Sequence, residues 1–137
     1  MKKSKIVMLI ILIMIIVLEI LPYGAVCNFA NPNGNSVRTT YSYFDLTPFG
    51  YANFGPFITG ILTCALVVLC IICIMKNSKK LSKTISVISG VSVITSLLPL
   101  MYGFAYVSVI GIIISVLLLS LFLISVLWKE PKNNELK

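Results

Sequence analysis

Glu19 is the only charged residue inside the long apolar stretches of this chain, which makes it the first candidate for chemistry. An intramembrane carboxyl is a functional candidate because its charge is costly unless it is paired or protonated. Counted from Ile6 at about 1.5 Å per residue, Glu19 lies roughly 20 Å along a helix, in the outer third of a membrane. Two roles stay open: a proton or cation site, and a structural carboxyl that reaches water, Arg38 or a tyrosine hydroxyl.

Four serines form a stripe along the apolar stretch 84–101. At 100° per residue they fall within about a third of the helix circumference. They are Ser86, Ser89, Ser92 and Ser96. We expect the stripe to face other helices, where each hydroxyl bond contributes about 0.6 kcal/mol. A polar conduit is the functional alternative, and hydroxyl bonds to the helix's own carbonyls are the structural one. The candidate ion, proton or polar site therefore comprises Glu19, Ser89, Ser92 and Ser96.

Other residue types that support catalysis are missing or badly placed. Cys70 and Cys73 have the C-x-x-C spacing of redox and metal motifs, but an apolar helix would stabilise a thiolate poorly. We interpret them as small packing residues. The chain has no histidine, which excludes a serine–histidine or cysteine–histidine nucleophile. Without a glycine-rich phosphate loop or paired catalytic carboxylates, we expect no enzyme activity, no metal site and no cofactor.

The polar stretch 22–56 contains the second candidate site. Its section 27–35 is rich in turn residues, with NPNGN at 31–35 as the strongest signal, and 37–44 predicts a short extended segment. Proline and glycine spacing excludes a long helix in 46–57. Every aromatic residue except Phe122 and Trp128 lies at or beyond the outer membrane boundary.

These aromatic rings suit the lipid headgroup layer, so a belt folded onto the membrane helices as a cap is the general interpretation. A face that binds a partner or lipid is the functional one. The candidate binding face comprises Arg38, Tyr41, Tyr43, Phe44, Asp45, Phe49, Tyr51 and Phe54.

The elements that must position these residues follow from composition. The chain has 137 residues, of which 58% are hydrophobic and 11% charged, which is atypical of a soluble domain. A hydrocarbon core of about 30 Å takes roughly 20 apolar helical residues, and backbone groups in lipid must be paired internally. We expect spans at 6–21, 57–75, 84–101 and 105–128. The prediction is an all-α membrane protein, with four transmembrane helices in one antiparallel bundle and a long extracytoplasmic loop at 22–56.

Basic residues fix the expected orientation. Ten of the eleven lie before the first span, between the second and third, or after the fourth, and Arg38 is the exception. Because lysine and arginine favour cytoplasmic segments, we expect both termini in the cytoplasm of a multi-pass protein of the plasma membrane. The same rule explains the net charge of +7 without nucleic acid. We also expect the first span to be an uncleaved anchor.

Two pairs of small residues predict close helix packing. Gly60 and Cys64 in one descending span match Gly111 and Ser115 in the other, each pair four residues apart. Small residues at this spacing let helix backbones approach in lipid. An internal duplication of the two helical hairpins is an alternative explanation of the match.

The segments LPYGAV at 21–26 and SYFDLTPFGYANFGP at 42–56 resemble those of small uncharacterised four-helix membrane proteins of Gram-positive bacteria. This resemblance covers most of the chain and implies no activity. In outline the topology is similar to claudin-like proteins, without their paired loop cysteines and tryptophan motif. The lone glutamate of the first span resembles the one in small multidrug transporters. Its outer position and the long loop differ from the pattern of that family.

Two hypotheses of function follow. The first is a non-enzymatic interaction or accessory protein, which associates with itself, another membrane protein or an external ligand through its aromatic outer loop. The second is a small oligomeric transporter or channel that uses Glu19 and the serine stripe. In either case the lipid bilayer is an expected partner.

Overall fold

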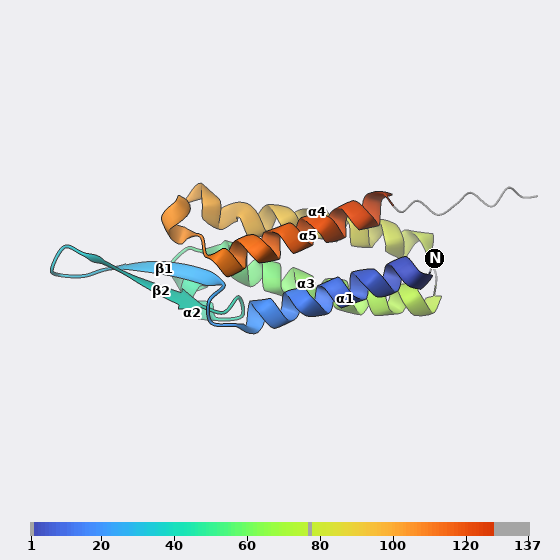
Figure 1. Ribbon diagram of the computed structural model, residues 1–137, viewed down its shortest axis with the longest axis horizontal. Helices are drawn as coiled ribbons and strands as arrows, with labels where there is room; N and C mark the ends of the chain where they lie inside the picture. The colour runs from blue at the N-terminus through green and yellow to red at the C-terminus, as the bar shows by residue number, and fades with distance from the viewer. Residues whose placement is uncertain (1, 77, 128–137) are drawn as a thin grey trace, which may run out of the picture.

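The computed structural model describes residues 2–76 and 78–127, and these form a helical bundle with a β-hairpin at one end (Figure 1). Along the chain the elements are α1 (Lys2–Ile20), β1 (Ala25–Ala30), β2 (Ser36–Tyr41), α2 (Leu46–Gly50), α3 (Phe54–Lys76), α4 (Lys79–Met101), the 3-10 turn η1 (Phe104–Tyr106) and α5 (Val109–Leu127).

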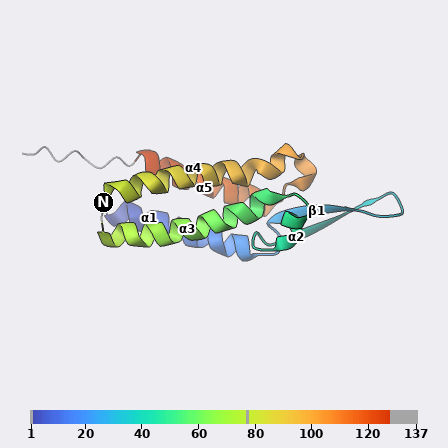
Figure 2. The ribbon, with the colours of Figure 1, turned by 180° about the vertical axis from the view of Figure 1, so that it is seen from behind.

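The four long helices pack side by side and antiparallel, with α3 against α1 and α4, and α5 against the same two helices (Figures 1 and 2). The start of α1 and the connection from α3 to α4 lie at one end, which we call the lysine end (Figure 1). We call the opposite end, which holds the β-hairpin, α2 and η1, the hairpin end. The lysine end holds Lys3, Lys5, Lys76, Lys79, Lys80 and Lys83.

Three of the helices are long and apolar enough to cross a membrane: α3, α4 and α5. With 23, 23 and 19 residues they extend about 34, 34 and 28 Å, close to a hydrocarbon core of about 30 Å. The chain is therefore a multi-pass membrane protein. Helix α1 also has 19 residues, but it carries lysines near its start and Glu19 near its end.

Several boundaries differ from the expected spans. Helix α5 begins at Val109 instead of residue 105, because 104–106 form the separate turn η1. Helix α3 begins three residues early, at Phe54. Its Pro56 is tolerated in the first turn, where backbone N–H groups have no acceptor within the helix. Trp128 and the three lysines that follow it in the sequence lie outside the described residues.

The all-α expectation is wrong in the loop between α1 and α3. Strands β1 and β2 form an antiparallel hairpin, in a register that runs from Ala25 opposite Tyr41 to Ala30 opposite Ser36. Gly34 closes the expected turn, with its N–H 3.0 Å from the carbonyl oxygen of Asn31 and a positive φ of 83°. Residues 27–30, expected in a turn-rich segment, lie in β1, because each of them pairs with a residue of β2.

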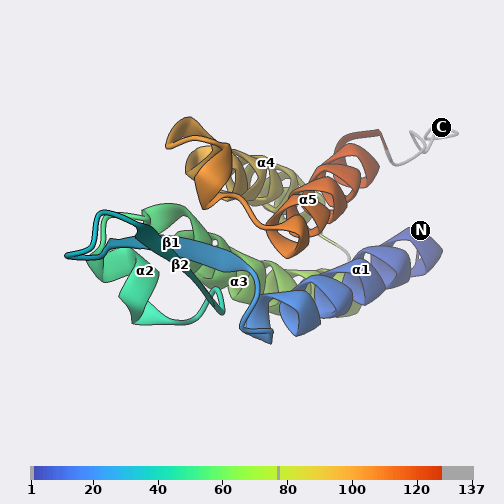
Figure 3. The same ribbon diagram turned by 60° about the vertical axis from the view of Figure 1, so that its left-hand side comes forward.

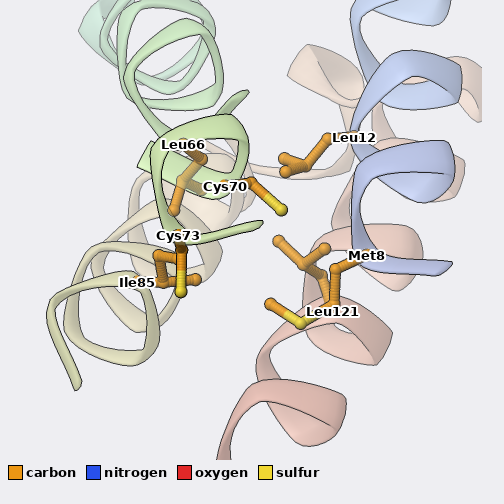
Figure 4. Close-up of a cluster of buried hydrophobic side chains, with 7 residues drawn as sticks. All are labelled: Met8, Leu12, Leu66, Cys70, Cys73, Ile85 and Leu121. Carbon is orange, nitrogen blue, oxygen red and sulfur yellow. The ribbon is translucent and has the colours of Figure 1, made fainter. Parts of the chain in front are cut away.

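The core of the bundle consists of two clusters. The cluster nearer the lysine end is apolar and combines leucine, isoleucine, methionine and two cysteine side chains (Figure 4). Its buried members are Met8, Leu12, Leu66, Cys70, Cys73, Ile85 and Leu121. The cluster nearer the hairpin end includes two residues of the loop, Ala25 and Tyr43, among the buried helix residues Ile15, Ile114 and Leu118.

Helices α3 and α4 make a close contact at the hairpin end. Pro99 lacks the N–H that would donate to the carbonyl of Thr95, four residues before it. Gly55 packs against this carbonyl, and a Cβ at Gly55 would stand 2.7 Å from the Thr95 oxygen. The missing donor and the missing side chain therefore act together to bring the two helices into contact.

Candidate functional site

Glu19 lies on the face of α1 that packs into the bundle. Met8, Leu12, Ile15 and Glu19 follow one another at spacings of four, three and four residues, and all four are buried. This periodicity places them on one side of the helix. The exposed fraction of Glu19 is 0%, so the bundle encloses its carboxyl group.

Only one oxygen of this carboxyl has a hydrogen-bond partner. The Thr63 hydroxyl on α3 lies 2.9 Å from Glu19 Oε1, whereas Oε2 is buried without a partner. A structural carboxyl that reaches water or Arg38 was one of the two roles left open. Glu19 has no exposed surface, however, and Arg38 donates to the Val107 carbonyl at 2.8 Å. Tyr43 contacts Glu19 through its backbone, where its N–H donates to the Glu19 carbonyl at 2.9 Å.

Two threonines of α3 continue the polar contacts across the bundle. The hydroxyl of Thr63 lies 2.9 Å from the Thr59 carbonyl, and the Thr59 and Thr95 hydroxyls lie 2.9 Å apart. Thr59 and Thr63 are fully buried. They were not among the residues expected at a site, although both lie on the same buried face of α3 as Leu66.

Three residues of the expected serine stripe are buried, and their hydroxyls bond to carbonyls within α4. Ser89, Ser92 and Ser96 donate to carbonyls of their own helix, three or four residues earlier, at 3.0, 2.9 and 2.8 Å. Ser86 and Ser89 also contact Ser125 of α5. Because none of these hydroxyls contacts Glu19, the serines and the carboxyl do not form one site.

Tyr43 closes the bundle above Glu19. Its side chain is 1% exposed, although we expected it on an outer binding face. Its ring fills the space beside Gly24, where an added Cβ would lie 2.8 Å from the ring. Burial raises the pKa of the Tyr43 phenol above its ordinary value, so the group stays neutral. Tyr43 is therefore a core residue contributed by the loop.

The remaining residues of the expected binding face are divided among several roles. Phe44 is half-buried, and its ring packs on Gly60. Asp45 caps α2, because its Oδ1 accepts the N–H of Thr47 at 2.8 Å. Hydrogen bonds from the side chain and the backbone N–H of Thr47 hold the pKa of Asp45 below its ordinary range. Three aromatic rings remain on the outside, with Phe49, Tyr51 and Phe54 exposed by 38, 67 and 42%.

The exposed rings belong to two edge-to-face clusters at the hairpin end. Phe49 lies 4.9 Å from Phe54 and 5.4 Å from Phe57 between ring centroids. Phe29 lies 4.9 Å from Tyr51 and 6.5 Å from Tyr41. These geometries are favourable for aromatic pairs, so the clusters join α2 and the hairpin to the bundle.

The expected helix-packing residues do not behave as two equivalent pairs. Ser115 of α5 contacts the Ser96 carbonyl of α4 at 3.4 Å, but Cys64 is exposed and does not pack between helices. Gly111 lies close to the Gly24 carbonyl and Tyr43, whereas Gly60 faces Phe44. Helix α3 instead turns Thr63 inward, which leaves Cys64 outside. These different surroundings give no support to an internal duplication.

A cavity of about 390 Å³ lies between α4 and α5 at the hairpin end. Its lining is almost entirely apolar and includes Leu97, Leu100, Phe104 and Val116. Tyr43 and Ser96 also reach it, but Glu19 does not line it. The cavity therefore offers no polar route to the buried carboxyl.

The described residues contain no group of three or more histidine, cysteine, aspartate or glutamate side chains that could hold a metal ion. The chemistry available near Glu19 is limited to hydrogen bonding and proton exchange between a carboxyl and threonine hydroxyls. Comparisons of the chain with protein-family models, curated proteins and solved structures found no match.

Proposed function

We propose that this chain is a non-enzymatic interaction or accessory protein of the cell membrane, which presents its β-hairpin to a protein partner on the extracytoplasmic side. The observation that carries the proposal is the hairpin itself, which projects beyond the helices (Figures 1 and 3). Residues 30–38 are all exposed. A two-stranded hairpin is marginally stable alone, so a projecting one needs support at its base.

The base of the hairpin has that support. Asn28 and Arg38 donate to the carbonyls of Ala105 and Val107, at 3.3 and 2.8 Å. Asn53 donates to the Val26 carbonyl at 3.1 Å from the other side. The hairpin is thus held on the bundle while its tip stays open, an arrangement suited to recognition, because little conformational freedom is lost on binding.

The outer edge of β2 is a suitable surface for a protein partner to bind. Strand β2 pairs only with β1 in the two-stranded sheet, so its second edge is unpaired. An unpaired edge can accept a further strand, with main-chain bonds supplying affinity and side chains supplying specificity. Another membrane protein or a second copy of this chain could supply that strand.

The orientation in this proposal rests on α1 as a fourth membrane crossing. The outward side of α1 is apolar: Ile10, Ile13 and Val17 are 53, 52 and 56% exposed. Such a surface is unfavourable in water and suits lipid. With four crossings, the lysine end and both termini would be cytoplasmic, as the positive-inside rule favours. Membership of the chain in a Gram-positive group of small membrane proteins stays a prediction.

A transporter or channel that uses Glu19 is the alternative. The geometry favours it less, because Glu19 is enclosed and the serines bond within α4. The variant Glu19→Gln separates the two hypotheses. An interaction protein should keep its partner in this variant, whereas a transporter should lose its activity.

The proposal is tested by photo-crosslinking in cells, with a photoreactive residue at Val37, which is 50% exposed in β2. We expect a discrete protein adduct. The matched control is the same residue at Val126, which is 44% exposed on α5, far from the hairpin. Equal protein adducts from both positions would contradict the proposal.

A variant with a shortened hairpin is the second part of this crosslinking test. Since Phe29 pairs with Val37, residues 30–36 can be replaced by Asn-Gly, a two-residue turn that suits a hairpin. This change leaves Tyr43 and the base in place. We expect normal insertion and at least a tenfold lower adduct yield, on the order of the effect of losing one binding hot spot. An unchanged adduct yield would show that the tip of the hairpin does not contact the partner.

A further inference from the structure

The buried carboxyl of Glu19 has a feature that the interaction role does not use. Among the described residues, its Oε2 has no hydrogen-bond partner and its Oε1 has only the Thr63 hydroxyl, although Glu19 has no exposed surface. An ionised carboxylate accepts hydrogen bonds at both oxygens and is costly to bury with a single donor. The surroundings of Glu19 therefore suit a neutral carboxyl group.

The single proton of the Thr63 hydroxyl also favours a neutral Glu19. The Thr63 hydroxyl has one proton, yet its oxygen lies 2.9 Å from both Glu19 Oε1 and the Thr59 carbonyl oxygen. With an ionised Glu19, one of these two contacts would have no proton between its oxygens. If the carboxyl carries a proton on Oε1, it donates to Thr63, and Thr63 donates to Thr59. Both short contacts are then hydrogen bonds.

No cation among the described residues compensates a charge on Glu19. Arg38 donates to the Val107 carbonyl, and Lys5 donates to the Cys73 carbonyl near the lysine end. Helix α5 has no titratable residue, and the lysines of α4 lie in its first two turns, at the lysine end. The titratable groups that interact electrostatically with Glu19 are Tyr43 and Cys64, which are neutral when protonated.

We propose that Glu19 and Thr63 form a proton-binding site between α1 and α3, in which one proton is held on Glu19 and shared with the Thr63 hydroxyl. A metal cation fits less well, because hard cations such as Ca²⁺ and Mg²⁺ take about six or more oxygen ligands. Release of the proton requires water or a base to reach Glu19. Since Tyr43 closes the bundle above Glu19 and bonds to its carbonyl, release also requires movement at the base of the hairpin.

The test observes the carboxyl directly. The chain has three glutamates, so the double variant Glu130→Gln/Glu135→Gln leaves Glu19 as the only one. Glutamate with a ¹³C-labelled side-chain carboxyl then reports on this site alone, by solid-state NMR of the full chain in phosphatidylethanolamine–phosphatidylglycerol vesicles.

We expect the neutral-acid signal to dominate at pH 7. A glutamate in water at this pH has roughly 500 carboxylates for each neutral acid. We also expect Thr63→Val to shift the carboxyl signal, and Thr63→Ser, which keeps the hydroxyl, to restore it. A carboxylate signal at pH 7 would overturn the proposal. Conversion of the acid to carboxylate by sodium at constant pH would assign the site to a metal cation and would overturn it as well.

Discussion

The two halves of this bundle bury different types of side chain. Near the lysine end the helices meet through leucine, isoleucine, methionine and cysteine side chains, and the described core there holds no carboxyl group (Figure 4). Near the hairpin end the same helices bury Glu19, two threonines and several serines. A segment from outside the bundle contributes Tyr43 to that half.

This difference in buried side chains reflects how the helices associate in each half. In lipid, helices gain little from the hydrophobic effect and associate through packing and hydrogen bonds. Near the lysine end the apolar cluster supplies the packing, and contacts such as Ser86 to Ser125 add hydrogen bonds between neighbouring helices. At the hairpin end the helices must also hold a loop, and directional contacts such as the Tyr43 N–H to the Glu19 carbonyl provide a fixed position for it.

The largest expected effect comes from moving a carboxyl into the other half. Leu12 is fully buried in the apolar cluster, seven residues before Glu19. We expect Leu12→Glu to lower the free energy of unfolding by about 3 kcal/mol, because no polar group of that cluster is placed to receive it. Unfolding of the purified protein by sodium dodecyl sulfate measures this. Leu12→Gln is the matched control, and equal stability of the two variants would show that the halves do not differ in their tolerance of a carboxyl.

A smaller loss is expected when the polar half loses one hydroxyl. Thr63→Val keeps the shape of the side chain but leaves Glu19 without any partner at Oε1. We expect a loss of about 2 kcal/mol, the cost of an unsatisfied buried polar group. The same unfolding assay applies, with Thr63→Ser as control. If Thr63→Val were as stable as the unmodified protein, the Glu19–Thr63 contact would contribute nothing to the polar half.

The contribution of the loop is tested at Gly24. Gly24→Ala would place a methyl group 2.8 Å from the ring of Tyr43, which is enclosed and has little space to move. We expect a loss of about 1 to 2 kcal/mol, typical of an overpacked core. Cys27 lies in β1, three residues after Gly24, and burial raises the pKa of its thiol, so we expect it to react faster with a maleimide when the overpacked loop opens. Gly50→Ala is the control, because nothing lies within 4 Å of the Cβ it would add.

The smallest effect is expected at the cap of α2. Asp45→Ala removes the side-chain acceptor for the Thr47 N–H, and loss of such a cap costs about 1 kcal/mol. Because the pKa of Asp45 is lowered by folding, its contribution is fully present above about pH 4 and is lost as the pH falls through the folded value. Thermal unfolding at pH 7 and at pH 3 measures both effects. Asp45→Asn should keep the cap without this pH dependence, and a pH-dependent Asn variant would contradict the assignment.

Features determined by local composition could be predicted from the sequence. Long apolar runs identify α3, α4 and α5 as helices able to cross a membrane, because the length and the polarity of the segment decide this. The NPNGN turn was also predictable, since Gly34 supplies a positive φ that other residues avoid. Strand β1 was missed because pairing with β2 stabilises it more than its own composition does.

The site depends on rotations and contacts that composition does not contain. Thr63 and Cys64 are neighbours, and both continue a pattern of small residues, but only the rotation of α3 decides which of them faces Glu19. Tyr43 has the composition of an interfacial aromatic residue, and it is buried because Gly24 leaves room for its ring. Glu19 was identified from its rarity in an apolar span, but its enclosure was not.

The contacts at the base of the hairpin also determine the order of assembly. The bonds from Asn28, Arg38 and Ser108 join residues that are 77, 69 and 84 positions apart in the chain. A ribosome therefore releases both strands long before the residues that hold them. The hairpin completes its attachment only after the turn before α5 has been synthesised and has reached the same side of the membrane. Its anchored state therefore depends on the placement of α3 and α4, which carry the chain to that turn.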